Sequence, residues 1–140
     1  MDNIIFTENG SRWIASAMCG VYRPVDTVYV IYSNTDSRPT IPNNPAITYF
    51  ESVSGAYGCL GSSRTTCLTK DSTAVFTAIV SEDDKITGTL SSTSKLVSVA
   101  LVSGSDVIML ADFDNPVQWV PGSSMTISVP LGITSTSSEA

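Results

Sequence analysis

The sequence predicts an all-β fold, a jelly-roll-like antiparallel β-sandwich with one short helix near its N-terminus. Short runs of β-branched and aromatic residues recur at hairpin spacing, with turn residues between them. After Pro24 no second helical pattern follows that could connect parallel strands. Ser and Thr supply 38 of the 140 residues and only 14% are charged, which suits sheets because Lys and Glu are depleted in strands. A closed barrel is the alternative all-β arrangement.

The length fits one domain, which we place at residues 1–133, followed by a flexible polar tail at residues 134–140. A helix is expected over about residues 8–19, because four apolar residues recur there at helical spacing and form one stripe: Trp13, Ile14, Ala17 and Met18. Gly20 is well placed to end this helix in a left-handed conformation. We expect the stripe to pack on the edge of the sheet.

The remaining apolar runs give ten candidate segments, of which we expect about eight or nine to form strands. Residues 27–33 (TVYVIYS) are apolar on both faces and predict an interior strand. Residues 125–133 are expected to form a strand, because apolar and polar residues alternate strictly from Met125, which is typical of a half-buried strand. Residues 35–45 hold three prolines and form a long loop, and loops of this length are usually functional or interfacial. The other expected strands cover residues 48–53, 57–60, 65–68, 73–81, 86–90, 96–103, 107–113 and 117–120.

The residue types needed for catalysis are scarce. Without histidine, neither a Ser-His-Asp nor a Cys-His site can be built, and the three cysteines lack the CxxC spacing of a zinc site. Two acidic runs, residues 82–84 and 112–115, lack the spaced carboxylates of a calcium loop, so we interpret them as solvated turns. We therefore expect a protein that is not an enzyme and has no cofactor and no metal.

Cys59 and Cys67 allow two readings. If residues 61–65 form a hairpin centred on Ser63, the two cysteines face each other and could form a disulfide. In a reducing cytoplasm we favour two small buried side chains instead.

Five aromatic residues also allow two readings. They could form a platform that stacks on sugars, or they could be anchors in the core or in a subunit interface. We favour the core or interface for these residues, which are Tyr29, Tyr32, Tyr49, Tyr57 and Trp119.

Charge and hydropathy limit the partners. The net charge is −6 and the seven basic residues are spread along the chain, which argues against nucleic-acid binding. The N-terminus lacks the basic and apolar pattern of a signal peptide, and no apolar run is long enough to cross a membrane. We expect synthesis in a cytoplasm and no contact with membranes.

The order of motifs in the second half, ITGTLSSTSKLVSVALVSG and then DVIMLADFDNPVQWVPGSSMTISVPLGI, resembles small structural proteins of tailed bacteriophage virions. The first half is similar too, in RWI at residues 12–14, VDTVYV at 25–30 and the Pro-rich loop leading into YFE at 49–51. The resemblance implies a capsid decoration, tail or fibre subunit, made in the cytoplasm of a host bacterium. Its expected partners are other virion proteins and copies of itself, as a trimer or ring.

Under this hypothesis we expect contacts from the N-terminal arm and from the Pro-rich loop, because a lone sandwich needs neither. The expected contact residues are Ile4, Ile5, Phe6, Arg38, Pro39, Ile41, Pro42 and Trp119. Deleting residues 1–6 should then weaken assembly while leaving a soluble fold. The alternative function is a glycan-binding β-sandwich module, either free-standing or at the tip of a fibre.

Overall fold

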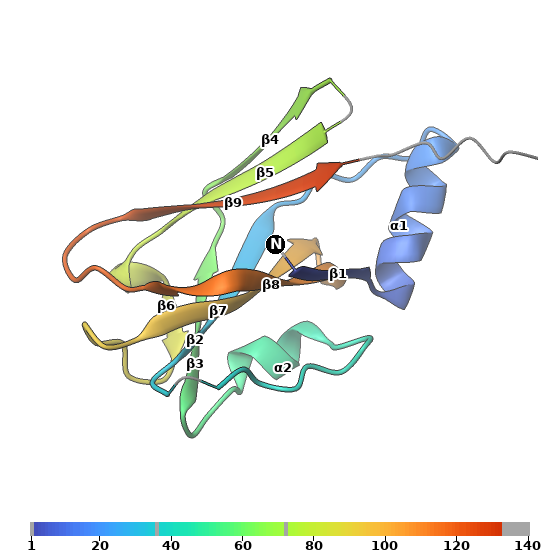
Figure 1. The fold of residues 1–140 in the computed structure, drawn as a ribbon. Coiled ribbons are helices and arrows are strands. Elements are labelled where there is room, and N and C mark those ends of the chain that lie inside the picture. Colours follow the sequence, from blue (N-terminus) through green and yellow to red (C-terminus); the bar gives the residue numbers. More distant parts are fainter. Residues whose placement is uncertain (1, 36, 72, 133–140) are drawn as a thin grey trace, which may run out of the picture.

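A computed structural model describes residues 2–35, 37–71 and 73–132 of the chain. Its strands form two antiparallel sheets, which together with a short N-terminal helix confirm the predicted all-β sandwich (Figure 1). The larger sheet contains β1 (Asp2–Phe6), β2 (Thr27–Ser33), β3 (Tyr57–Ser62), β6 (Lys85–Thr87), β7 (Lys95–Ser103) and β8 (Asp106–Gln118). The smaller sheet contains β4 (Thr65–Lys70), β5 (Thr73–Val80) and β9 (Met125–Gly132). The spatial orders are β1-β8-β7-β2-β3-β6 and β4-β5-β9.

The central strands of the larger sheet are covered on both faces. As predicted, β2 covers residues 27–33 and is an interior strand, between β3 and β7. One of its faces, with Val28 and Val30, packs against the smaller sheet in the main hydrophobic core. The opposite face, with Tyr29 and Ile31, packs in a second apolar cluster. This explains why the sequence of β2 is apolar throughout.

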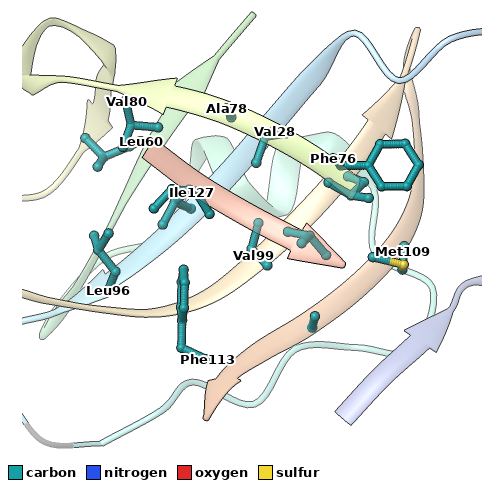
Figure 2. Packing of buried hydrophobic residues seen from close by; sticks show 14 of the residues in the cluster. Val28, Leu60, Phe76, Ala78, Val80, Leu96, Val99, Met109, Phe113 and Ile127 are labelled. Carbon is teal, nitrogen blue, oxygen red and sulfur yellow. The ribbon is translucent and has the colours of Figure 1, made fainter. Parts of the chain in front are cut away.

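The main core lies between the two sheets (Figure 2). From the smaller sheet, the inward positions of β5 and β9 alternate with exposed or half-buried ones. Ile127 and Val129 are buried while Thr126 and Ser128 between them are exposed, which confirms the half-buried strand predicted near the C-terminus. Ile133, which the sequence included in that strand, lies outside the described residues, as does the tail at residues 134–140.

The expected strand over residues 48–53 is wrong, because this segment contains helix α2 (Ile47–Glu51). Ile47 and Phe50 are three residues apart, so one helical face carries both to the second apolar cluster. Phe50 is fully buried and its ring stacks on Tyr29, with 5.4 Å between ring centroids. The sequence pattern of this segment was ambiguous between strand and helix, and packing against the larger sheet selects the helix.

Helix α1 (Glu8–Met18) confirms the expected helix near the N-terminus, and Gly20 follows it with φ of +88°. Thr7 caps the helix, since its Oγ1 accepts a hydrogen bond of 2.9 Å from the backbone N of Gly10. The backbone N of Thr7 donates to the carbonyl oxygen of Ile108 over 3.1 Å, and Thr7 Oγ1 donates to the carbonyl oxygen of Val107. These bonds fix the start of α1 against β8.

Three further strand predictions need correction. The expected strand at residues 117–120 is instead the end of β8, in which Gln118 pairs with Lys95. The strand expected at residues 86–90 is the three-residue β6. The hairpin considered for residues 61–65 does not form, because β3 and β4 belong to different sheets. Strand β3 is already paired on both sides, with β2 and β6, and has no edge left for β4.

Candidate functional site

The N-terminal strand and the Pro-rich loop meet on one face of the larger sheet. Ile5, Pro39 and Ile41 line a small cavity of about 140 Å³ together with part of β8. Arg38 holds the loop there, since its guanidinium donates to the carbonyl oxygens of Phe113 and, over 3.3 Å, of Asp114. We call Ile5, Pro39, Ile41 and the adjoining residues of β8 (Leu110, Ala111 and Asp112) the loop cavity.

The other expected contact residues lie elsewhere. Ile4 and Phe6 point away from the loop cavity and pack against the main core, as the alternation of a strand requires. Arg38 and Pro42 are exposed. Trp119 is 1% exposed and belongs to the main core, so its side chain offers no surface to a partner in the folded subunit. The sequence favoured either the core or a subunit interface for Trp119, and the structure places it in the core.

A larger apolar surface lies between α1 and the smaller sheet. A groove of about 570 Å³ opens there, and its walls come from four strands (β1, β4, β5 and β9), the helix and the segment after it. Figure 1 shows α1 standing beside the ends of β4, β5 and β9 that lie farthest from the turn between β8 and β9. We call this surface the helix groove; it is lined by Phe6, Trp13, Ile14, Tyr22, Cys67, Thr69, Ala74, Phe76 and Leu131.

The polar groups around the helix groove are largely engaged within the fold. Trp13 Nε1 donates to the carbonyl oxygen of Arg23 over 2.7 Å, and the Trp13 ring is tilted against Tyr22 at 6.1 Å between centroids. The partial burial of the Cys67 thiol in the groove wall raises its pKa above the ordinary value, although the residue as a whole is exposed. No charged side chain is among the lining residues. Such a surface suits the apolar face of another molecule rather than a charged or strongly polar ligand.

The sequence pattern identified the apolar residues of one wall of the helix groove, the wall formed by α1. Trp13 and Ile14 belong to the predicted apolar stripe of α1, but they are only half-buried and line an open groove. At the end of the stripe, Met18 is 84% exposed. The opposite wall comes from strands that the sequence placed in an ordinary core, so the pattern of α1 alone could not reveal the groove.

The acidic runs serve as local structural elements. Asp84 Oδ2 accepts from the backbone N of Ser81 over 2.7 Å and pairs with Arg64 Nη2 over 2.5 Å. Glu82 accepts from the backbone N of Gly122 over 3.0 Å. In the second run, Asp112 accepts from Ser98 Oγ over 2.7 Å. Within residues 2–35, 37–71 and 73–132, no group of three or more His, Cys, Asp or Glu side chains could hold a metal ion.

The five aromatic residues do not form an exposed platform. Tyr29, Tyr32 and Trp119 are at most 9% exposed. Burial raises the pKa of Tyr32 to about 12, and its hydroxyl donates to the carbonyl oxygen of Thr87 over 2.7 Å. Tyr49 and Tyr57 are half-buried, and their hydroxyls bond to the Pro-rich loop and its start, at Thr40 and Ser37. These rings build the core and hold the loop.

The three cysteines are free thiols. Cys59 is buried in β3, where burial raises the pKa of its thiol to about 12, whereas Cys67 is exposed in β4. The two residues belong to different sheets and do not face each other as the hairpin hypothesis required. A protonated, buried Cys59 is a small apolar side chain and not a nucleophile at neutral pH.

Among the described residues, neither α-helix has the length and apolar character that crossing a membrane requires. Comparison of the chain with protein-family models, with curated proteins and with solved structures finds no match.

Proposed function

We propose that this protein is a non-enzymatic structural subunit that acts through protein–protein contacts, and that its assembly is the virion of a tailed bacteriophage. The helix groove carries the first part of this proposal. It is an apolar, uncharged surface of about 570 Å³ that a solitary subunit has no reason to leave open. The sequence resemblance to small virion proteins supports the second part.

The loop cavity is a second contact surface under this proposal. Ile5 and Phe6 are neighbours in β1 and point to opposite faces of the larger sheet, so the loop cavity and the helix groove lie on opposite faces as well. Contacts on two faces suit a subunit that joins two neighbours in a closed assembly. The arrangement is consistent with capsid decoration and with a tail or fibre position.

The proposal is tested by asking whether the chain travels with phage particles. Particles would be induced from the bacterial strain that encodes the chain and separated on a density gradient, with mass spectrometry of each fraction. We expect the chain in the particle fraction at a fixed ratio to the major capsid or tail protein. Recovery only among soluble proteins, in a preparation with intact particles, would rule out a virion subunit.

The helix groove is tested by Ile14→Asp, which places a charge in its wall, with Ala15→Asp as the control on the exposed side of the same helix. We expect Ile14→Asp to reduce incorporation into particles at least about tenfold, because an apolar partner surface would have to bury an unpaired carboxylate. The control should be incorporated normally. Ile5→Glu tests the loop cavity in the same way. These point variants are cleaner than deleting residues 1–6, because Ile4 and Phe6 also pack in the core.

A further inference from the structure

The four sheet edges differ in how they are protected from pairing with another strand. Strand β1 has an irregular register against β8, and β6 is only three residues long with an irregular register against β3. Strand β9 contains Pro130. Bulges, short strands and proline all discourage pairing at an edge. Strand β4 has six residues in regular register with β5, has no proline, and carries a charge only at its end, at Lys70.

Hydrogen bonding shows which backbone groups of β4 face outward. The backbone N of Ile79 donates to the carbonyl oxygen of Arg64 over 3.1 Å, so the backbone of Arg64 faces β5. The register between β4 and β5 is regular from Thr65 to Lys70, so hydrogen-bonded pairs alternate along it from the Arg64–Ile79 pair onward. Since the direction of the backbone N–H and C=O groups alternates along a strand, those of residues 66, 68 and 70 face β5. The N–H and C=O groups of Thr65, Cys67 and Thr69 therefore face away from β5.

The same alternation explains Pro130. Residues 74, 76 and 78 of β5 direct their backbone groups toward β9, so Val75 and its registered partner Pro130 form a pair without hydrogen bonds. The nitrogen of Pro130 therefore lies on the free edge of β9, where its missing N–H costs no bond within the sheet. One edge of the smaller sheet is blocked by proline, and no strand among the described residues pairs with the outer edge of β4.

We propose that β4 pairs antiparallel with β4 of a second copy of this chain, so that the two smaller sheets join across a two-fold axis. The exposed character of β4 agrees with this, since residues 66–70 are all exposed and Leu68 is 72% exposed. Side chains that face each other across the axis must lie on the same face of the joined sheet. That condition allows only registers centred on a residue, and among these the registers centred on Cys67 and on Leu68 pair the most residues of β4.

Charge selects between these two registers. Centring on Cys67 places Lys70 opposite Arg64 of the other copy, twice by symmetry, and so adds a second cation beside the ion pair of Arg64 with Asp84. Centring on Leu68 places Thr66 opposite Lys70 instead. In this register the outward backbone N–H and C=O groups of Cys67 pair with those of Thr69 in the other copy. The Leu68 side chains of the two copies then meet on the outer face of the joined sheet. We therefore assign the register centred on Leu68.

The inference holds whether or not the assembly is a virion, because it is tested on the purified chain. Sedimentation velocity from about 10 µM to about 1 mM should show a monomer–dimer equilibrium, since one strand pair is a small interface. Leu68→Lys places like charges on the axis, and Thr69→Pro removes an outward N–H, as Pro130 does in β9. Each should weaken dimerisation at least about tenfold. Ile79→Lys is the control, because Ile79 lies on the same outer face but in the central strand.

Cross-linking tests the register. In a chain in which all three native cysteines are replaced by serine or alanine, Leu68→Cys should form a disulfide-linked dimer under mild oxidation, because opposed residues without hydrogen bonds come close enough. Ile79→Cys in the same background should not. A monomer at every concentration would overturn the proposal, as would equal weakening by Ile79→Lys. Cross-linking no faster at position 68 than at position 79 would also overturn it.

Discussion

Gly10 offers the sharpest test of how α1 sits on the sheet. A β-carbon added at this position would lie 1.8 Å from the carbonyl oxygen of Ile108, a backbone atom of β8. Backbone cannot swing aside as a side chain does. Ordinary van der Waals contact begins near 3.4 Å, so Gly10→Ala requires α1 to withdraw by about 1.6 Å. At an exposed helical position the same substitution would stabilise the protein by about 1 kcal/mol.

The cost of that withdrawal can be worked from the contacts at the start of the helix. Moving α1 strains the bonds from Thr7 to the carbonyl oxygens of Ile108 and Val107, each worth about 1 kcal/mol. Overpacking adds about 1–3 kcal/mol. After the gain in helix propensity is subtracted, Gly10→Ala should lower the free energy of unfolding by about 2–4 kcal/mol.

The assay is urea unfolding followed by tryptophan fluorescence, with Ala15→Gly as the control. Ala15 is exposed on α1, so its replacement should cost only about 1 kcal/mol of helix propensity. Thermal unfolding should agree, with Tm of Gly10→Ala lower by about 10 °C. A stabilised Gly10→Ala variant would refute the close approach of α1 to β8 and, with it, the position of the helix-groove wall.

Three other variants test separate parts of the fold. Because burial raises the pKa of Cys59 from 9.0 to about 12, its thiol favours folding below pH 9 and this contribution is lost as pH rises toward 12. Between these values Cys59→Ala should remove about 1.4 kcal/mol per pH unit from the slope of unfolding free energy against pH, and an unchanged slope would contradict the assignment. Trp119→Ala should lower the free energy of unfolding in urea by about 3–5 kcal/mol. A loss below about 1 kcal/mol would show that the Trp119 side chain is not buried. Asp84→Ala should lower the free energy of unfolding by about 1 kcal/mol, because it removes the helix cap and the ion pair with Arg64. Asp83 is exposed, so Asp83→Ala should leave the free energy of unfolding almost unchanged. Equal effects of the two substitutions would contradict the capping role of Asp84.

The parts of the fold that local pattern determines could be predicted from the sequence. The spacing of Trp13 and Ile14 located α1, and the continuous apolar run at residues 27–33 gave β2 with its full bounds. Alternation of Ile127 and Val129 with polar residues gave the half-buried face of β9. In each case the period of the pattern matches the geometry of one element and one neighbour.

The incorrect predictions concern segments whose conformation depends on contacts with residues that are distant in the sequence. The stretch GSSR at residues 61–64 has the composition of a hairpin turn, yet it carries the chain from the larger sheet to the smaller one. Ser62 is buried at this crossing, where its hydroxyl donates to the carbonyl oxygen of Ile79 over 2.6 Å. No local pattern contains that bond. The two walls of the helix groove were likewise separated by about fifty residues of sequence, so no single window contained both.

The unequal sheets explain why an open apolar surface exists at all. Neighbouring strands lie about 4.8 Å apart, so three strands cover only about half the width of six. Helix α1 packs against β8 and shields part of the remainder, and the helix groove is the gap between α1 and the smaller sheet. Strand β4 borders that gap with the side chains of Cys67 and Thr69 while their backbone groups form its open edge. The helix groove and the outer edge of β4 thus meet on one strand. A partner strand that binds there can cover apolar area and extend the smaller sheet in a single contact.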